Sequence, residues 1–270
     1  MSALRTIAGF VTAPSTTETA LTMATGDSLT IINSPRPVWL VSAWCDAQTA
    51  GLFHLTAPRG THDNNQGIRL QNFASEVYPL LSPPFTPMFL AQDTITAKLT
   101  GSGTAGDIET GVLQFFYEDL PGANARLIDY GKLMRCMEPG FLMTGENTLA
   151  LGTAGGYSGE EALNADFDQF RGNRDYALLG INTNVECAMI GLRGPDTGYN
   201  RIGFPGNDTN KSLTRNFLVV LSRAIGRPTI PVINAANKAA TLVDGVQDEN
   251  GADPTVTWFF AMLKEGWEKL

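Results

Sequence analysis

Short apolar runs alternate with clusters of Gly, Pro, Asn, Asp and Ser along the whole chain. The runs are rich in Val, Ile, Thr and aromatic residues, a composition that favours strands over helices. Turn signals recur about every 8–12 residues, a spacing typical of a β-sandwich or a β-barrel. The predicted strands are 28–33, 38–44, 52–56, 88–90, 94–99 and 112–118, followed by 176–181, 186–192, 230–234, 239–243 and 255–263.

Three segments show the apolar spacing of a helix instead. Phe73–Leu81 and Leu213–Ile225 each come before the last strands of one half of the chain. Ala125–Met137 lies between the halves, so it predicts a helical connector.

An internal repeat organises these elements. Residues 72–117 align with residues 216–261 at a constant shift of 144 positions, without a gap, and 55–58 align with 192–195. The repeat predicts two homologous sandwiches, residues 1–121 and 146–270, that share a packed interface and are joined by a connector over 122–145. The identical pairs of the ungapped stretch are Asn72 and Asn216, Phe73 and Phe217, Pro84 and Pro228, Pro87 and Pro231, Ala91 and Ala235, Gly101 and Gly245, Val112 and Val256, Phe115 and Phe259, and Phe116 and Phe260.

The composition excludes several classes of protein. Apolar residues make up 43% of the 270 positions, which rules out a disordered chain. Nineteen Lys and Arg against 27 Asp and Glu give a net charge of −8, so the chain is not built to neutralise phosphates over a broad face. We therefore expect no sequence-specific binding of nucleic acid.

Neither export nor membrane insertion is indicated. No window holds 18 or more consecutive apolar residues, and the first 20 residues lack the basic region and continuous apolar core of a signal peptide. Cys45, Cys136 and Cys187 are odd in number and far apart, which fits synthesis in a reducing cytosol better than a disulfide framework.

Motifs for cofactor binding and catalysis are weak. The run Gly101–Gly106 has the letters of a dinucleotide fingerprint, but a strand is predicted after it instead of the required helix, so we interpret it as a hairpin loop. His54 and His62 have no partner at the spacing of a metal or nucleophile site. Gly156–Gly159 lacks the spacing of a nucleophile elbow and is interpreted as a flexible loop.

Acidic clusters are equally unspecific. Asp166 and Asp168 alternate around Phe167 and are interpreted as a solvated strand face rather than a glycosidase pair. The loop Asp244–Asp253 offers many oxygens but lacks the ligand order of an EF-hand. The sequence therefore predicts no catalytic residue, no cofactor site and no metal site.

The four tryptophans predict packing instead of sugar stacking. Trp39, Trp44 and Trp258 lie in predicted strands, where large rings usually fill a core or an interface. Trp267 lies beyond the last repeated strand, so we expect it to be free to contact a neighbouring chain and predict it as an interface residue.

Two tandem sandwiches, each with a short helix before its last strands, resemble the double jelly-roll major capsid proteins of tailless icosahedral phages with internal membranes and of adenoviruses. The resemblance is architectural, covers nearly the whole chain and rests on no signature motif. It implies an all-β fold of two tandem jelly-roll sandwiches with a few short helices. It also implies a structural virion protein, made in the host cytoplasm, that forms trimeric, pseudo-hexagonal capsomers.

The same resemblance implies partners: other copies of the chain, neighbouring capsomers, further capsid proteins such as a vertex protein, and the viral internal membrane. At 270 residues the chain is short for that group, which predicts short loops without receptor-binding towers. Two alternatives stay open. One is a tandem jelly-roll lectin or virion spike that binds a glycan or a receptor. The other is a bicupin-like enzyme, which two histidines disfavour.

Overall fold

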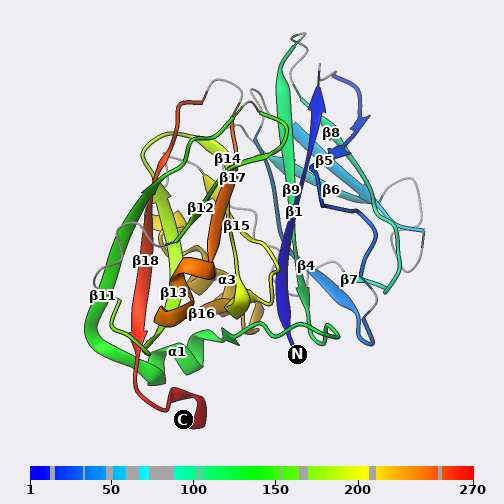
Figure 1. Cartoon of the computed structure of the whole chain (residues 1–270). Coiled ribbons are helices and arrows are strands. Elements are labelled where there is room, and N and C mark those ends of the chain that lie inside the picture. Colours follow the sequence, from blue (N-terminus) through cyan, green and yellow to red (C-terminus); the bar gives the residue numbers. More distant parts are fainter. Residues whose placement is uncertain are drawn as a thin grey trace.

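The fold consists of two β-rich halves that lie side by side (Figure 1). It was obtained as a computed structural model. The structure describes residues 1–12, 16–32, 34–46, 51–58, 67–72, 88–101, 104, 106–152, 154–163, 170–206, 211–248 and 251–270.

The first half is built from two antiparallel sheets, ordered β3-β1-β9-β4-β7 and β2-β8-β5-β6. Its strands are β1 (Ala3–Thr12), β2 (Thr19–Ala20), β3 (Thr22–Met23), β4 (Val38–Asp46), β5 (Gly51–Thr56), β6 (Ile68–Asn72), β7 (Met88–Phe89), β8 (Thr96–Thr100) and β9 (Ile108–Tyr117).

The second half has sheets ordered β10-β16-β13-β18-β11 and β12-β17-β14-β15. The strands are β10 (Leu127–Ile128), β11 (Met137–Thr148), β12 (Tyr157–Ala162), β13 (Asp175–Thr183), β14 (Cys187–Arg193), β15 (Ile202–Gly206), β16 (Ile230–Asn234), β17 (Leu242–Val246) and β18 (Thr255–Leu263). The helices are α1 (Tyr130–Cys136), α2 (Lys211–Thr214) and α3 (Phe217–Ile225), with 3₁₀ turns η1 (Pro195–Thr197), η2 (Ala235–Ala240) and η3 (Trp267–Lys269).

Both halves have jelly-roll topology, as predicted. Without the short additional strands β3 and β10, each half has eight strands in the described part of the chain. Counted along each half, strands one, eight, three and six form one sheet, which is β1-β9-β4-β7 in the first half and β11-β18-β13-β16 in the second. Strands two, seven, four and five form the other sheet, which is β2-β8-β5-β6 and β12-β17-β14-β15. This is the eight-strand arrangement of two interlocked Greek keys. The fold is therefore two tandem jelly-roll sandwiches.

Strand register agrees with the repeat at its C-terminal end. Phe116 of β9 is paired with Leu4 on one side and Trp39 on the other. Phe260 of β18 is paired in the same way with Met143 and Leu178. Phe116 and Phe260 therefore occupy equivalent places in the two folds. The predicted partner of Pro231, Pro87, lies outside the described residues.

A bulge is also repeated. In β4 the register with β9 shifts between Leu40 and Ser42, and in β13 the register with β18 shifts between Leu178 and Gly180. A β-carbon on Gly180 would lie 2.1 Å from the carbonyl oxygen of Thr214, so only glycine lets α2 lie this close to the strand. The glycine at the bulge of the second half thus makes room for α2.

Some predicted elements differ from the structure. Residues 28–33 form no strand over their described part, where Thr30 makes a single bridge to Thr94. Residues 239–243 begin as the turn η2 before β17 starts at Leu242. The helix predicted at 213–225 is present as α2 and α3, whereas the segment 73–81 lies outside the described residues.

The chain between the halves is not a free connector. Leu127 and Ile128 are paired with Pro231 and Ile230, and β11 already begins at Met137, so the second sandwich starts before the predicted boundary at 146. The helix is also shorter than 125–137, because the side chain of Asp129 accepts a hydrogen bond from the Lys132 amide at 2.8 Å and caps it there.

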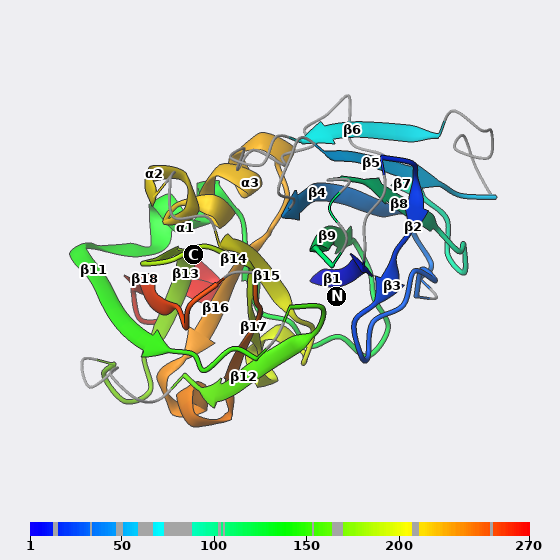
Figure 2. The same cartoon turned by 90° about the horizontal axis from the view of Figure 1, so that it is seen from above.

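One sheet of the first half is buried on both faces. Its inner face contributes Ile7, Leu113 and Phe115 to the core of the first sandwich. Its outer face contributes Leu4, Val112 and Phe116 to a second core that continues through the other half. Figure 2 shows β14 and β15 beside this outer face, and β1 contacts β15 while β4 contacts β14. The outer face of this sheet and the interior of the second sandwich therefore form one continuous apolar cluster. We call this buried interface between the two sandwiches the seam.

Because this sheet is buried on both faces, two neighbouring substitutions should lower the free energy of unfolding by similar amounts. Phe115→Ala empties space inside the first sandwich, and Phe116→Ala empties space at the seam, where Phe116 is only 1% exposed. Each should lower the free energy of unfolding by about 3–5 kcal/mol in urea titrations, with a single transition. A much smaller loss for Phe116→Ala, or two separate transitions, would show that the halves are independent.

Candidate functional site

Aromatic rings connect the two sandwiches through the seam. Trp44 of β4 contacts Phe217 of α3 edge to face, with ring centroids 6.2 Å apart. Phe217 contacts Phe204 at 6.2 Å, and Phe204 contacts Trp258 at 5.9 Å. The indole Nε1 of Trp44 also donates to the carbonyl of Ala188 across the seam at 3.0 Å. These contacts confirm the packing roles predicted for Trp44 and Trp258.

Buried polar groups fix how the halves are aligned. The Thr6 hydroxyl oxygen accepts hydrogen bonds from the Gly203 amide at 2.8 Å and from Gln114 Nε2 at 3.0 Å. The Thr6 amide donates to the carbonyl of Arg201 at 2.8 Å. A β-carbon on Gly203 would lie 2.6 Å from the Thr6 methyl group, so this approach requires glycine. Because unpaired polar groups are costly to bury, the seam has one favoured alignment.

A charged network closes one end of the seam. Tyr157 of β12 donates its hydroxyl to Asp27 Oδ2 of the first half at 2.5 Å. The guanidinium of Arg201 lies 3.4 Å from the centroid of the Tyr157 ring. Arg201 Nη2 and Nε donate to the buried Asp244 at 2.6 and 3.0 Å. The network joins a loop of the first sandwich to β12 and β17 of the second.

Burial sets the protonation of this network. Desolvation raises the pKa of Tyr157 well above its ordinary value, and the neighbouring Asp27 raises it further, so the hydroxyl stays a donor at neutral pH. Burial also raises the pKa of Asp27, against the hydrogen bonds from Tyr157 and the Ala8 amide. The sequence gives no signal for this group, because the glycines of Gly156–Gly159 predict a flexible loop, whereas Tyr157 begins the strand β12.

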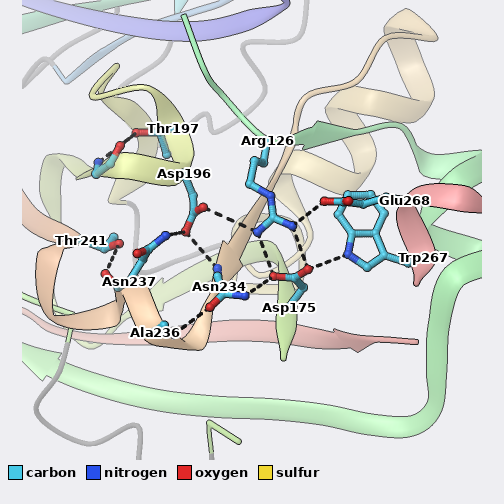
Figure 3. A network of polar contacts seen from close by, with 11 residues as sticks. Arg126, Asp175, Asp196, Thr197, Asn234, Ala236, Asn237, Thr241, Trp267 and Glu268 are labelled. Carbon is cyan, nitrogen blue, oxygen red and sulfur yellow. Dashed lines mark hydrogen bonds and ion pairs between the residues drawn. The ribbon is translucent and has the colours of Figure 1, made fainter. Parts of the chain in front are cut away.

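A second polar network holds the C-terminus, and we call it the latch (Figure 3). Arg126 donates from Nη1 and Nη2 to the two carboxylate oxygens of Asp175, both at 2.8 Å. Asp175 Oδ2 also accepts the indole N–H of Trp267 at 2.8 Å, and Asp175 Oδ1 accepts from Asn234 at 2.7 Å. Glu268 accepts from Arg126 at 2.9 Å.

The side chain of Trp267 packs within its own chain. The indole is 7% exposed and belongs to the core of its own second sandwich. Lys132 Nζ lies 5.0 Å and Arg126 Cζ lies 5.7 Å from its ring centroid. The turn η3 folds the tail back, so the indole of Trp267 is bonded to Asp175, and the contact with a neighbouring chain stays a prediction.

The catalytic candidates have structural roles or lie outside the described residues. His54 is buried, and its Nδ1 is 2.8 Å from Glu18 Oε2, while Glu18 Oε1 is 3.0 Å from Arg69. The Ser158 hydroxyl accepts from the Gly152 amide at 2.9 Å. Among candidates outside the described residues are His62, Asp166 and Asp168.

Two further predictions concern loops. Gly101–Gly106 joins β8 of one sheet to β9 of the other, so it is a connection between sheets and not the predicted hairpin. A strand follows it, as predicted. In the acidic loop, Asp244 is paired with Arg201. Within the described residues, no three His, Cys, Asp or Glu side chains are arranged to hold a metal ion.

Comparisons with known proteins assign no family. No family model matches the chain, and no curated protein matches its sequence. No helix in the described part of the chain is long and apolar enough to cross a membrane. The site is therefore interpreted from its geometry, which consists of the charged network at one end of the seam and the latch at the C-terminus.

Replacement of Trp267 should damage the fold. Trp267→Ala removes a buried ring and leaves Asp175 without one hydrogen-bond donor, so we expect a loss of about 3–5 kcal/mol of unfolding free energy in urea titrations. Trp267→Phe keeps most of the packing and should cost less. If Trp267→Ala leaves the stability unchanged but reduces self-association, the result would support a contact of Trp267 with a neighbouring chain instead.

Acid should release the latch. Burial alone raises the pKa of Asp175, but hydrogen bonds from Arg126, Trp267 and Asn234 outweigh it and hold the pKa below its ordinary value. The stabilisation is therefore complete above about pH 4, the unfolded pKa of Asp, and is lost as the pH falls through the folded pKa. Asp175→Asn should be less stable at neutral pH and should lose less stability on acidification. Urea titrations across pH measure this, and parallel pH profiles of the two proteins would contradict it.

Proposed function

We propose that the chain is a structural shell protein that assembles as trimeric, pseudo-hexagonal capsomers of an icosahedral virion. The observation that carries the proposal is the pair of sandwiches with the same jelly-roll topology, packed through a buried seam. Three such chains around a three-fold axis present six similar sandwiches, which is the outline of a hexagonal tile. The host cytoplasm is then the site of synthesis and the virion the final location.

The rigidity of the block supports this role. A shell tile must hold its shape while its edges contact neighbours. Here hydrogen bonds of Thr6, Gln114 and Trp44 fix the alignment of the sandwiches inside the seam. The charged network at the seam and the latch both join segments of the same chain.

The edge strand β11 is the proposed contact with another copy. It ends its sheet in the described part of the fold, and exposed sheet edges are prone to pair with other chains. Phe141 and Leu142 on this strand are 41% and 61% exposed, and Met134 on the preceding helix is 51% exposed. Phe141 and Leu142 are consecutive in the chain, and neighbouring exposed apolar side chains mark contact surfaces.

The mass of the particle in solution tests the proposal. Light scattering should give about three times the chain mass of 29.0 kDa, and electron microscopy of concentrated protein should show hexagonal tiles or shells. Leu142→Glu should shift the mass toward one chain without lowering the melting temperature. The matched control Leu270→Glu changes another exposed leucine, 61% exposed, and should leave the trimer intact.

A strictly monomeric wild-type protein at high concentration would overturn the shell proposal. The alternative, a tandem jelly-roll module for a glycan or receptor, would then become the better interpretation. If the wild-type protein is a trimer but both leucine variants lose it, the shell proposal stands, whereas β11 is no longer singled out as the contact.

A further inference from the structure

A polar cavity of about 310 Å³ opens between the two sandwiches, beside the charged end of the seam. Three arginines line it from three separate segments: Arg5 on β1, Arg193 at the end of β14, and Arg201 just before β15. Thr25 and Asp27 from the first half, and Asn200 from the second, complete the polar wall. The volume is at the lower end of the range for ligand sites, which suits a small group.

We propose that this cavity binds a small oxyanion of the phosphate type. The guanidinium groups have hydrogen-bond donors that their protein partners do not use. Arg5 forms no ion pair with any described residue. Arg193 Nε is buried without a hydrogen bond and lies 3.6 Å from Asp244. Arg201 directs Nε and Nη2 to Asp244, whereas Nη1 has only a 4.0 Å approach to Asp27.

The acidic groups around the cavity are already engaged. Asp244 accepts from Arg201, Glu160 accepts from Arg193, and Asp27 Oδ2 accepts from Tyr157 and from the Ala8 amide. These carboxylates hold two of the arginines in place. Their charges offset much of the positive charge, so affinity depends on the remaining N–H donors and especially on Arg5.

The wall is also prearranged. Tyr199 at the cavity has a left-handed backbone, with φ of 58°, which is strained for a residue with a side chain. Hydrogen bonds hold the loop in this form: the Tyr199 amide donates to the Gly194 carbonyl at 2.8 Å, and Asn200 Nδ2 donates to the Thr197 carbonyl at 3.1 Å. A site that needs no rearrangement loses less entropy on binding.

The geometry favours phosphate over a carboxylate. Phosphate presents four oxygens to donors that come from separate segments, whereas a carboxylate presents two oxygens suited to a single bidentate arginine. The inference does not depend on the shell proposal, because the cavity lies within one chain. Its ligand would bridge the two sandwiches and strengthen the seam.

Calorimetry and thermal melting with inorganic phosphate test the proposal, with sodium chloride at the same ionic strength as reference. We expect saturable binding at millimolar or lower concentrations and a rise in melting temperature with phosphate. Acetate and succinate at matched ionic strength test a carboxylate ligand and should bind more weakly. Equal or tighter binding of the carboxylates would overturn the choice of phosphate.

Arg5→Gln is the decisive variant, because Arg5 has no ion-pair partner among the described residues and its loss should not disturb the fold. The variant should bind phosphate roughly tenfold more weakly or worse, since a charge-assisted contact is removed. Arg36→Gln, at an exposed arginine of the same half, is the matched control and should bind as the wild type does. Equal binding in both variants, or no binding in the wild type, would refute the site.

Discussion

Burial of one sheet on both faces is the constraint on which this structure depends. The sheet β1-β9-β4 serves as a wall of its own sandwich and, on its other face, as part of the core of the second. Nine consecutive residues of β9 are buried, so this antiparallel strand has the continuous burial normally found in strands covered on both sides. An antiparallel sheet with one face in water would expose Leu4, Val112 and Phe116. The second sandwich is therefore part of what makes the first one stable.

Such a seam also has to satisfy the polar groups that it traps. Thr6 and Gln114 lie inside it, fully buried, and are bonded to the backbone of Gly203. At its solvent end the charges of Asp27, Arg201 and Asp244 are arranged in a chain that ties the two halves together. Apolar burial supplies the stability, whereas these directional contacts select one alignment of the halves out of many that would bury similar area.

The sequence predicts the parts of the fold that depend on local pattern. Apolar runs located β4, β5, β13, β14, β16 and β18, and the repeat correctly placed Phe116 over Phe260. β1 was missed because Thr6 and Gly9 interrupt its apolar pattern, yet Thr6 is a seam residue with a polar partner across the interface. The burial of Trp267 has no sequence signal, because position along the chain does not reveal that η3 turns back onto Asp175. Contacts between distant segments leave no local signal in the sequence. Both the charged network at the seam and the latch consist of such contacts.

Strand order identifies the fold of this chain, whereas contacts between distant segments determine how its parts are held together. Two jelly rolls can be recognised from strand order alone, and a shared seam makes them one rigid body rather than two modules on a tether. Arg126, just before β10, is bonded to Asp175 and Glu268, and its backbone is bonded to Asp196 and Val232, so the segment between the halves is anchored to the second sandwich. The chain thus anchors both the segment between its halves and its end, while sheet edges and a polar cavity between the halves remain open in the part that the structure describes. A protein built in this way is suited to act through its surfaces, because its interior connections already serve to hold a single shape.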